Sequence, residues 1–275
     1  MAIVTRASKV AALAVRRIRR RVPAALRGRS GVVLAYHDVL PDSADAYPYA
    51  VRRSTFLRQL DVASVAGFRF VTLTEFTDAL LSGDACGLAA VVFDDALSGV
   101  HRHALPALHE RRIPWTLLPV TDRTGVAPEW WPEAERTMTL TEIREALDAG
   151  ATLCSHTATH RSLPELPPAV ALDELRRSRD TVSEWAGTEI REICYPFGHQ
   201  NAQVRALTAE AGYRCGYTFT NGRSHPATDP FAQPRLAMRE GIPSHRWALT
   251  LLRPHRSWPP VRDLRDELHR GGGTS

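Results

Sequence analysis

The alternation of apolar, strand-like runs with helical segments most restricts the fold of this 275-residue chain. Eight runs are short and apolar enough to form buried strands, and most are followed by a helical segment. They lie at residues 31–36, 68–73, 89–93, 113–120, 151–154, 192–195, 216–220 and 235–238. One such helix is predicted at 98–112, and Thr139 with Glu142 three residues later predicts a capping box at the start of another. Such alternation is typical of α/β proteins with a parallel sheet. Because the chain contains seven or eight such strand–helix units, we predict a single distorted (β/α) barrel rather than an open sheet.

Basic residues are concentrated at the N-terminus. The first thirty residues contain nine basic residues and no acidic one, so the remainder is mildly acidic although the whole chain carries +5. We therefore divide the chain into a basic leader (1–30), an α/β domain expected to be catalytic (31–252) and a loosely packed tail (253–275), and expect no nucleic-acid binding. The apolar stretch 10–15 is too short for a secretory signal. We expect a cytoplasmic protein whose leader is either solvated or in weak contact with an anionic membrane.

The four cysteines, Cys86, Cys154, Cys194 and Cys215, show no paired spacing. Cys154 and Cys194 lie within apolar runs. We therefore predict free buried thiols rather than a disulfide framework.

Two adjacent acids end the run at 89–93. Asp94 and Asp95 follow it directly, and carboxylates are almost never buried without a partner. Side chains alternate along a strand, so the two carboxylates point in different directions and can have different roles. The alternative is that one caps the next helix while the other is solvated.

A histidine pair follows another predicted strand. His156 and His160 are four residues apart, directly after the run 151–154, and a tight loop of that length can direct both imidazoles at one point. Together with a carboxylate they would form a ligand set for zinc or a neighbouring transition metal that leaves coordination positions open. A Cys-His-His site that includes Cys154 is an alternative, because Cys154 and His156 would share a strand face.

These polar residues share one location in the predicted fold. His37, the two acids, His156 and the segment 196–197 each follow a strand. In a parallel barrel the functional residues lie at the carboxyl ends of the strands. Scattered solvated residues would have no reason to share that location, so we predict a single site.

Four short motifs, in this order, resemble those of the polysaccharide deacetylases, the NodB-homology or carbohydrate esterase family 4 domains. They are LAYHDV at 34–39, FDD at 93–95, HTATH at 156–160 and YPFG at 195–198. An N-terminal histidine motif is closest to the branch that deacetylates poly-N-acetylglucosamine, in which the motif order is circularly permuted. The resemblance covers residues 32–238.

The resemblance implies a metal-dependent hydrolase that removes N-acetyl groups from an amino sugar or an N-acetylated glycan. Asp95, His156 and His160 would hold one divalent metal, zinc in the first place, with nickel, cobalt, iron and manganese as alternatives. Asp94 would act as general base and His37 as the general acid that protonates the departing amine.

The resemblance also implies that the backbone N–H of Phe197 stabilises the oxyanion. The sequence departs from the family pattern nearby, since Ala96 replaces the usual glycine and Cys194 replaces an arginine that often steadies the base. Because alanine disfavours positive φ, we expect the loop after the acids to differ in shape. Arg235 or Arg239 could steady the base from the last strand.

The candidates for substrate contact are Tyr195, Pro196, Trp130, Trp131 and Arg235. The two tryptophans lie in the predicted loop 121–137 and could stack on a sugar ring or plug the mouth of the barrel. Two other functions stay open: an inactive carbohydrate-binding protein of the same fold, and a hydrolase of non-sugar amide C–N bonds.

Overall fold

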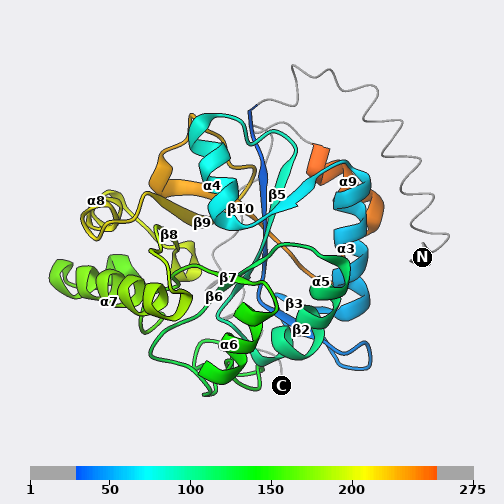
Figure 1. Cartoon of the computed structure of the whole chain (residues 1–275), viewed down its shortest axis with the longest axis horizontal. Coiled ribbons are helices and arrows are strands. Elements are labelled where there is room, and N and C mark those ends of the chain that lie inside the picture. The colour runs from blue at the N-terminus through cyan, green and yellow to red at the C-terminus, as the bar shows by residue number, and fades with distance from the viewer. Residues whose placement is uncertain (1–28, 253–275) are drawn as a thin grey trace, which may run out of the picture.

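The computed structural model describes residues 29–252 (Figure 1). Two predicted segments lie outside the described residues: residues 1–28 of the leader, and the tail at 253–275. The predicted division of the chain into leader, domain and tail therefore stays a prediction.

A curled parallel sheet forms the centre of the molecule. Its order is β7-β6-β5-β1-β10-β9-β8, with β4 beside the first half of β5. A parallel bridge between Ser155 and Ile193 joins the end of β7 to β8, and so links the two edges of the sheet. The predicted distorted (β/α) barrel is confirmed. The strands are β1 (Val32–Tyr36), β4 (Arg69–Val71), β5 (Leu88–Asp94), β6 (Thr116–Leu118), β7 (Thr152–Leu153), β8 (Glu192–Cys194), β9 (Cys215–Asn221) and β10 (Gln233–Ala237).

Helices surround this sheet. Figure 1 shows α3 and α9 next to each other on one side of it, and α7 and α8 on the opposite side. The α-helices are α3 (Arg53–Val65), α4 (Leu73–Ser82), α5 (Leu105–Arg111), α6 (Leu140–Asp148), α7 (Pro168–Ala186), α8 (Ala202–Glu210) and α9 (Ser244–Leu252). Short 3₁₀ turns lie at Leu163–Glu165, Pro196–Gly198 and Pro230–Ala232. No helix among residues 29–252 is long and apolar enough to cross a membrane.

Local cap chemistry explains where several helices begin. Thr139 and Glu142 form the predicted capping box at α6, in which each side chain binds the other residue's backbone N–H. The helix predicted at 98–112 is divided into a π-helix, η1 (Val100–Ala104), and α5. A small parallel pair, β2 (Asp38–Leu40) and β3 (Ala50–Arg52), was not predicted.

Side chains of β1 and β5 alternate between two apolar clusters. Val91 and Phe93 belong to the cluster that also contains residues of α3 and α9, whereas Ala90 and Val92 belong to a second cluster. The second cluster also contains Cys154, Cys194 and Cys215, which are buried and free, as predicted; Cys86 is free but exposed. By the same alternation Asp94 lies on the face of β5 that carries Val92.

Candidate metal and catalytic site

Loops at the carboxyl ends of four strands bring the predicted site residues together. His37 follows β1, Asp95 follows β5, His156 follows β7 and Phe197 follows β8. Several of these loops hold non-glycine residues in the left-handed region, where φ is 66° at Asp95, 67° at Thr157, 62° at His160 and 58° at Phe197. Residues held in such sparsely populated conformations concentrate at functional sites.

Three buried side chains converge on one point. The Oδ1 atom of Asp95 lies 3.1 Å from Nε2 of His160 and 3.4 Å from Nε2 of His156. Among residues 29–252 these three form the one group whose ligand atoms all lie within 4.8 Å of one another. The arrangement brings together the two-histidine, one-carboxylate set that the sequence predicted.

The tautomer of His156 follows from its second nitrogen. Nδ1 lies 2.7 Å from the carbonyl oxygen of Cys194, which can only accept, so Nδ1 carries a proton and Nε2 is the nitrogen that faces Asp95. An outer hydrogen bond of this kind is typical of metal-ligating histidines. Burial alone would raise the pKa of Asp95, but the His160 and His156 imidazoles outweigh it and hold the pKa well below its ordinary value.

These residues fit a divalent transition metal. Asp95 Oδ1 is buried and accepts no hydrogen bond within the described part of the chain, although a carboxylate oxygen without a partner is costly to bury. A cation between this oxygen and the two imidazole lone pairs would supply the missing partner. Three protein ligands also leave positions open, as in catalytic rather than structural sites.

Asp94 is held by a buried bidentate ion pair. Both guanidinium ends of Arg235 donate to it, at 2.7 Å to Oδ1 and 2.9 Å to Oδ2, and Nε of Arg235 donates to the carbonyl of Thr218. Burial raises the pKa of Asp94, but Arg235 more than offsets this, so the pKa lies below its ordinary value. Arg235 is fully buried, so it steadies Asp94 and has no surface for the substrate contact we also considered.

His37 lies beside Asp94 in an aromatic setting. Its Nε2 is 3.8 Å from Asp94 Oδ2, and the rings of Tyr49, Trp131 and Phe219 lie 5.3 to 5.6 Å from its own. Burial lowers the pKa of His37, and the negative charge of Asp94 opposes this shift. The His37 imidazole is therefore buried directly beside the Asp94 carboxylate.

The two tryptophans contact the site residues themselves. Nε1 of Trp131 donates to Oδ2 of Asp95 at 2.8 Å, and Trp131 is 4% exposed. Trp130 stacks on His160 with ring centroids 4.1 Å apart. Trp131 thus packs at the mouth of the barrel, as in the second of the two predictions made for the tryptophans, and is not free to stack on a sugar ring. Its hydrogen bond also orients Asp95.

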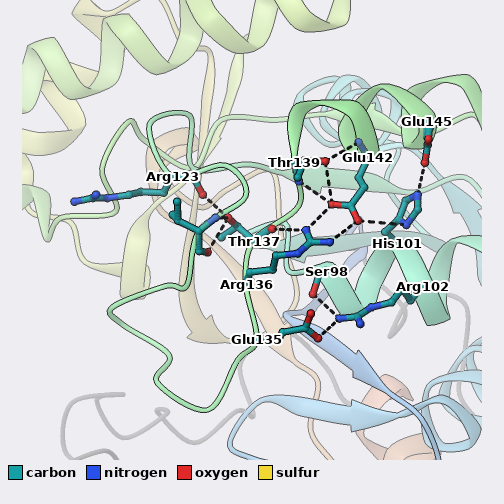
Figure 2. Close-up of polar contacts among 11 residues, drawn as sticks. Ser98, His101, Arg102, Arg123, Glu135, Arg136, Thr137, Thr139, Glu142 and Glu145 are labelled. Carbon is teal, nitrogen blue, oxygen red and sulfur yellow. Dashed lines mark hydrogen bonds and ion pairs between the residues drawn. The ribbon is translucent and has the colours of Figure 1, made fainter.

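The loop 121–137, which contains both tryptophans and is called the tryptophan loop below, forms ion pairs with neighbouring helices (Figure 2). Arg136 makes a bidentate ion pair with Glu142 at the start of α6, and Arg102 of η1 pairs with Glu135. His101 of η1 in turn lies 2.7 Å from Glu145 of α6. The position of the tryptophan loop is therefore set by η1 and α6.

Several sequence expectations are corrected by burial and backbone geometry. Tyr195 is fully buried and its hydroxyl donates to the carbonyl of Phe231, and Pro196 is also buried, so neither presents a surface to substrate. Cys154 is absent from the ligand group, and its thiol donates to the carbonyl of Glu192. Ala96 does adopt positive φ, 50°, so the glycine-like loop is formed without glycine.

A family model described as polysaccharide deacetylase matches residues 83–216, which include both acids and both metal-site histidines. A search of curated protein sequences gives no match.

Solved structures share the fold over most of the chain. IcaB from Ammonifex degensii is 26% identical, with a TM-score of 0.68 over 81% of this chain and 97% of that one. Deacetylase PplD from Streptococcus pyogenes, solved with acetate, is 22% identical, with a TM-score of 0.70 over 81% and 98%. BC0361, a polysaccharide deacetylase from Bacillus cereus, is 21% identical, with a TM-score of 0.69 over 81% and 69%. The family match over residues 83–216 and the shared barrel confirm the resemblance to the polysaccharide deacetylases that the four sequence motifs indicated.

Proposed function

We propose that the protein is a metal-dependent hydrolase that removes N-acetyl groups from an amino sugar or an N-acetylated glycan. The observation that carries the proposal is the convergence of Asp95, His156 and His160, with the Arg235-bound Asp94 and His37 directly beside them. The family match supports deacetylation, and the acetate in the PplD structure is the product such a reaction would release.

Asp95, His156 and His160 would hold the cation, zinc in the first place. When bound, a divalent cation lowers the pKa of a coordinated water and polarises an amide carbonyl. Asp94 would take the proton of the attacking water. Its low pKa keeps it ionised at neutral pH, and Arg235 fixes both of its oxygens so that it presents one orientation.

His37 would donate a proton to the departing amine. The Asp94 carboxylate raises the pKa of His37 against the effect of burial. Once Asp94 has accepted a proton this attraction is lost, so the His37 imidazolium becomes a stronger acid at the stage when the amine leaves. The backbone N–H of Phe197, at the start of the turn after β8, would donate to the developing oxyanion.

Acetate release tests this proposal. Purified protein is stripped with a chelator, reloaded with Zn²⁺ and incubated with N-acetylglucosamine, its oligomers and other N-acetylated sugars, while acetate and new amines are measured. We expect equal amounts of both products, loss of release after stripping and recovery with Zn²⁺. His160→Ala should be inactive, and His109→Ala, on α5 outside the site, serves as the matched control. Absence of acetate from every substrate at full metal loading would contradict the proposal.

A further inference from the structure

The loop between the two histidines is short and irregular, yet it must fix both imidazoles. Residues 156–160 form no helix or strand, and Thr157 and His160 have φ of 67° and 62°. Their backbone N–H groups therefore cannot be satisfied by regular secondary structure, and buried N–H groups need acceptors. His160 receives one locally, since its N–H donates to the Thr157 hydroxyl at 3.2 Å.

Glu174, from the middle of α7, supplies the acceptors at the centre of this loop. One of its carboxylate oxygens accepts from the N–H groups of Ala158, at 3.0 Å, and Thr159, at 2.9 Å. The other accepts from the Thr159 hydroxyl at 2.6 Å. Glu174 is 3% exposed. A carboxylate so deeply buried is retained only where its hydrogen bonds are made.

A second residue of α7 contacts the start of this loop by a hydrogen bond. Ser178, one turn after Glu174, lies 2.9 Å from the hydroxyl of Ser155, which directly precedes His156. Two successive turns of one helix thus contact the loop just before the first ligand and between the two ligands. A shift of α7 or a change in the reach of Glu174 would move the imidazoles relative to Asp95.

We propose that Glu174 is a positioning residue for the metal site, and that it acts through the reach of its carboxylate to the two loop N–H groups. The inference rests on the proposed metal-dependent function. Residues that orient metal ligands commonly change metal affinity by 10–100-fold when they are replaced. The alternative is that Glu174 contributes only negative charge near the cation.

Two substitutions separate reach from charge. Glu174→Gln keeps the length of the side chain and an oxygen that accepts from both N–H groups, but removes the charge. Glu174→Asp keeps the charge but is one methylene shorter. The same two changes at Glu184, which is exposed on the same helix, are the matched controls. The readouts are the affinity for Zn²⁺, measured by competition with a chelating dye, and the visible spectrum of the Co²⁺-loaded protein.

We expect Glu174→Asp to bind Zn²⁺ about 10–100-fold more weakly than the native protein and to alter the Co²⁺ spectrum. Glu174→Gln should be affected less, and the Glu184 variants should match the native protein. Native affinity in Glu174→Asp, or a loss in Glu174→Gln as large as that in Glu174→Asp, would overturn the inference. Failure of the native protein to bind Zn²⁺ would instead contradict the proposed function.

Hydrogen exchange in the native protein gives a test that needs no variant. With Glu174 as their acceptor, the Ala158 and Thr159 amides should exchange slowly even before Zn²⁺ is added. Rapid exchange of both amides in the metal-free protein would show that Glu174 does not hold the loop, and would overturn the inference.

Discussion

The ion pair between Asp94 and Arg235 joins side chains 141 positions apart in the sequence, at the point where a base is required. Both partners are buried, so each needs the other to compensate its lost hydration. The pair also gives Asp94 an arginine partner in a chain that has Cys194 where the motifs it resembles often have an arginine. The guanidinium comes from β10 instead of from the motif before Pro196.

Removing only one member of this pair should be strongly destabilising. We expect Arg235→Met to lower the free energy of unfolding by roughly 3–5 kcal/mol, because Asp94 is left buried and uncompensated. Urea unfolding measures this change. Adding Asp94→Asn to Arg235→Met should recover part of the loss, and strictly additive effects of the two substitutions would show that the pair is not energetically coupled.

At the scale of helices and strands, much of the fold followed from periodicity. The eight strands of the barrel and the capping box at Thr139 were predicted, because apolar runs and cap residues are local signals. The pair β2–β3 and helix α9 were missed, since short segments carry few such signals. The division of the 98–112 helix was also missed, because a π-turn has no distinct apolar period.

The site shows the same limit. The positions of Asp95, His156 and His160 after predicted strands indicated that these three side chains would lie together, as they do. Sequence position could not show that Trp131 donates to Asp95, or that Glu174 reaches the histidine loop, because these contacts depend on how separate elements pack. The burial of Tyr195 could not be predicted either, since a position beside a motif does not show whether a side chain is covered by other elements.

Helix α6 and the tryptophan loop are linked through Glu142, which accepts from Arg136 and also caps the helix (Figure 2). The hydrogen bond from Arg136 is the largest cause that lowers the pKa of Glu142, to about 2. The folded-state pKa lies below the unfolded value of about 4.3. The stabilisation is therefore present above pH 4.3 and is lost as the pH falls towards 2.

We predict that Glu142→Gln lowers the free energy of unfolding by about 1 kcal/mol at pH 6, a modest amount because water screens the partly exposed Arg136. The difference from the native protein should shrink between pH 5 and pH 3, as measured by urea unfolding at each pH. A difference that stays constant over this range would show that the charge of Glu142 does not carry the effect.

At the scale of the whole molecule, the two ends of the described chain meet. Arg223 donates to the carbonyl of Ser30 at 2.7 Å and to that of Leu251 at 2.6 Å. The described chain therefore begins beside α9. We propose that the basic leader contacts anionic membrane surfaces, because its nine basic residues adjoin a mildly acidic remainder.

Vesicle co-sedimentation tests this proposal. The full chain should bind vesicles that contain anionic lipid at low salt and be released as salt is raised, because screening weakens attraction between exposed charges. Deleting residues 1–28 keeps Ser30 and its contact with Arg223, so it should abolish binding without loss of acetate release. Equal sedimentation of both proteins would contradict a role for the leader.

The central claim is that two adjacent carboxylates have different roles, Asp95 as a metal ligand and Asp94 as the base. Metal content and turnover, measured together in Asp94→Asn and Asp95→Asn, test it most directly. Asp94→Asn should retain Zn²⁺ and lose about two to four orders of magnitude in acetate release, the usual contribution of a general base. Asp95→Asn should bind Zn²⁺ more weakly and regain activity in part when metal is in excess. Loss of metal from Asp94→Asn, or near-native turnover in that variant, would contradict the account.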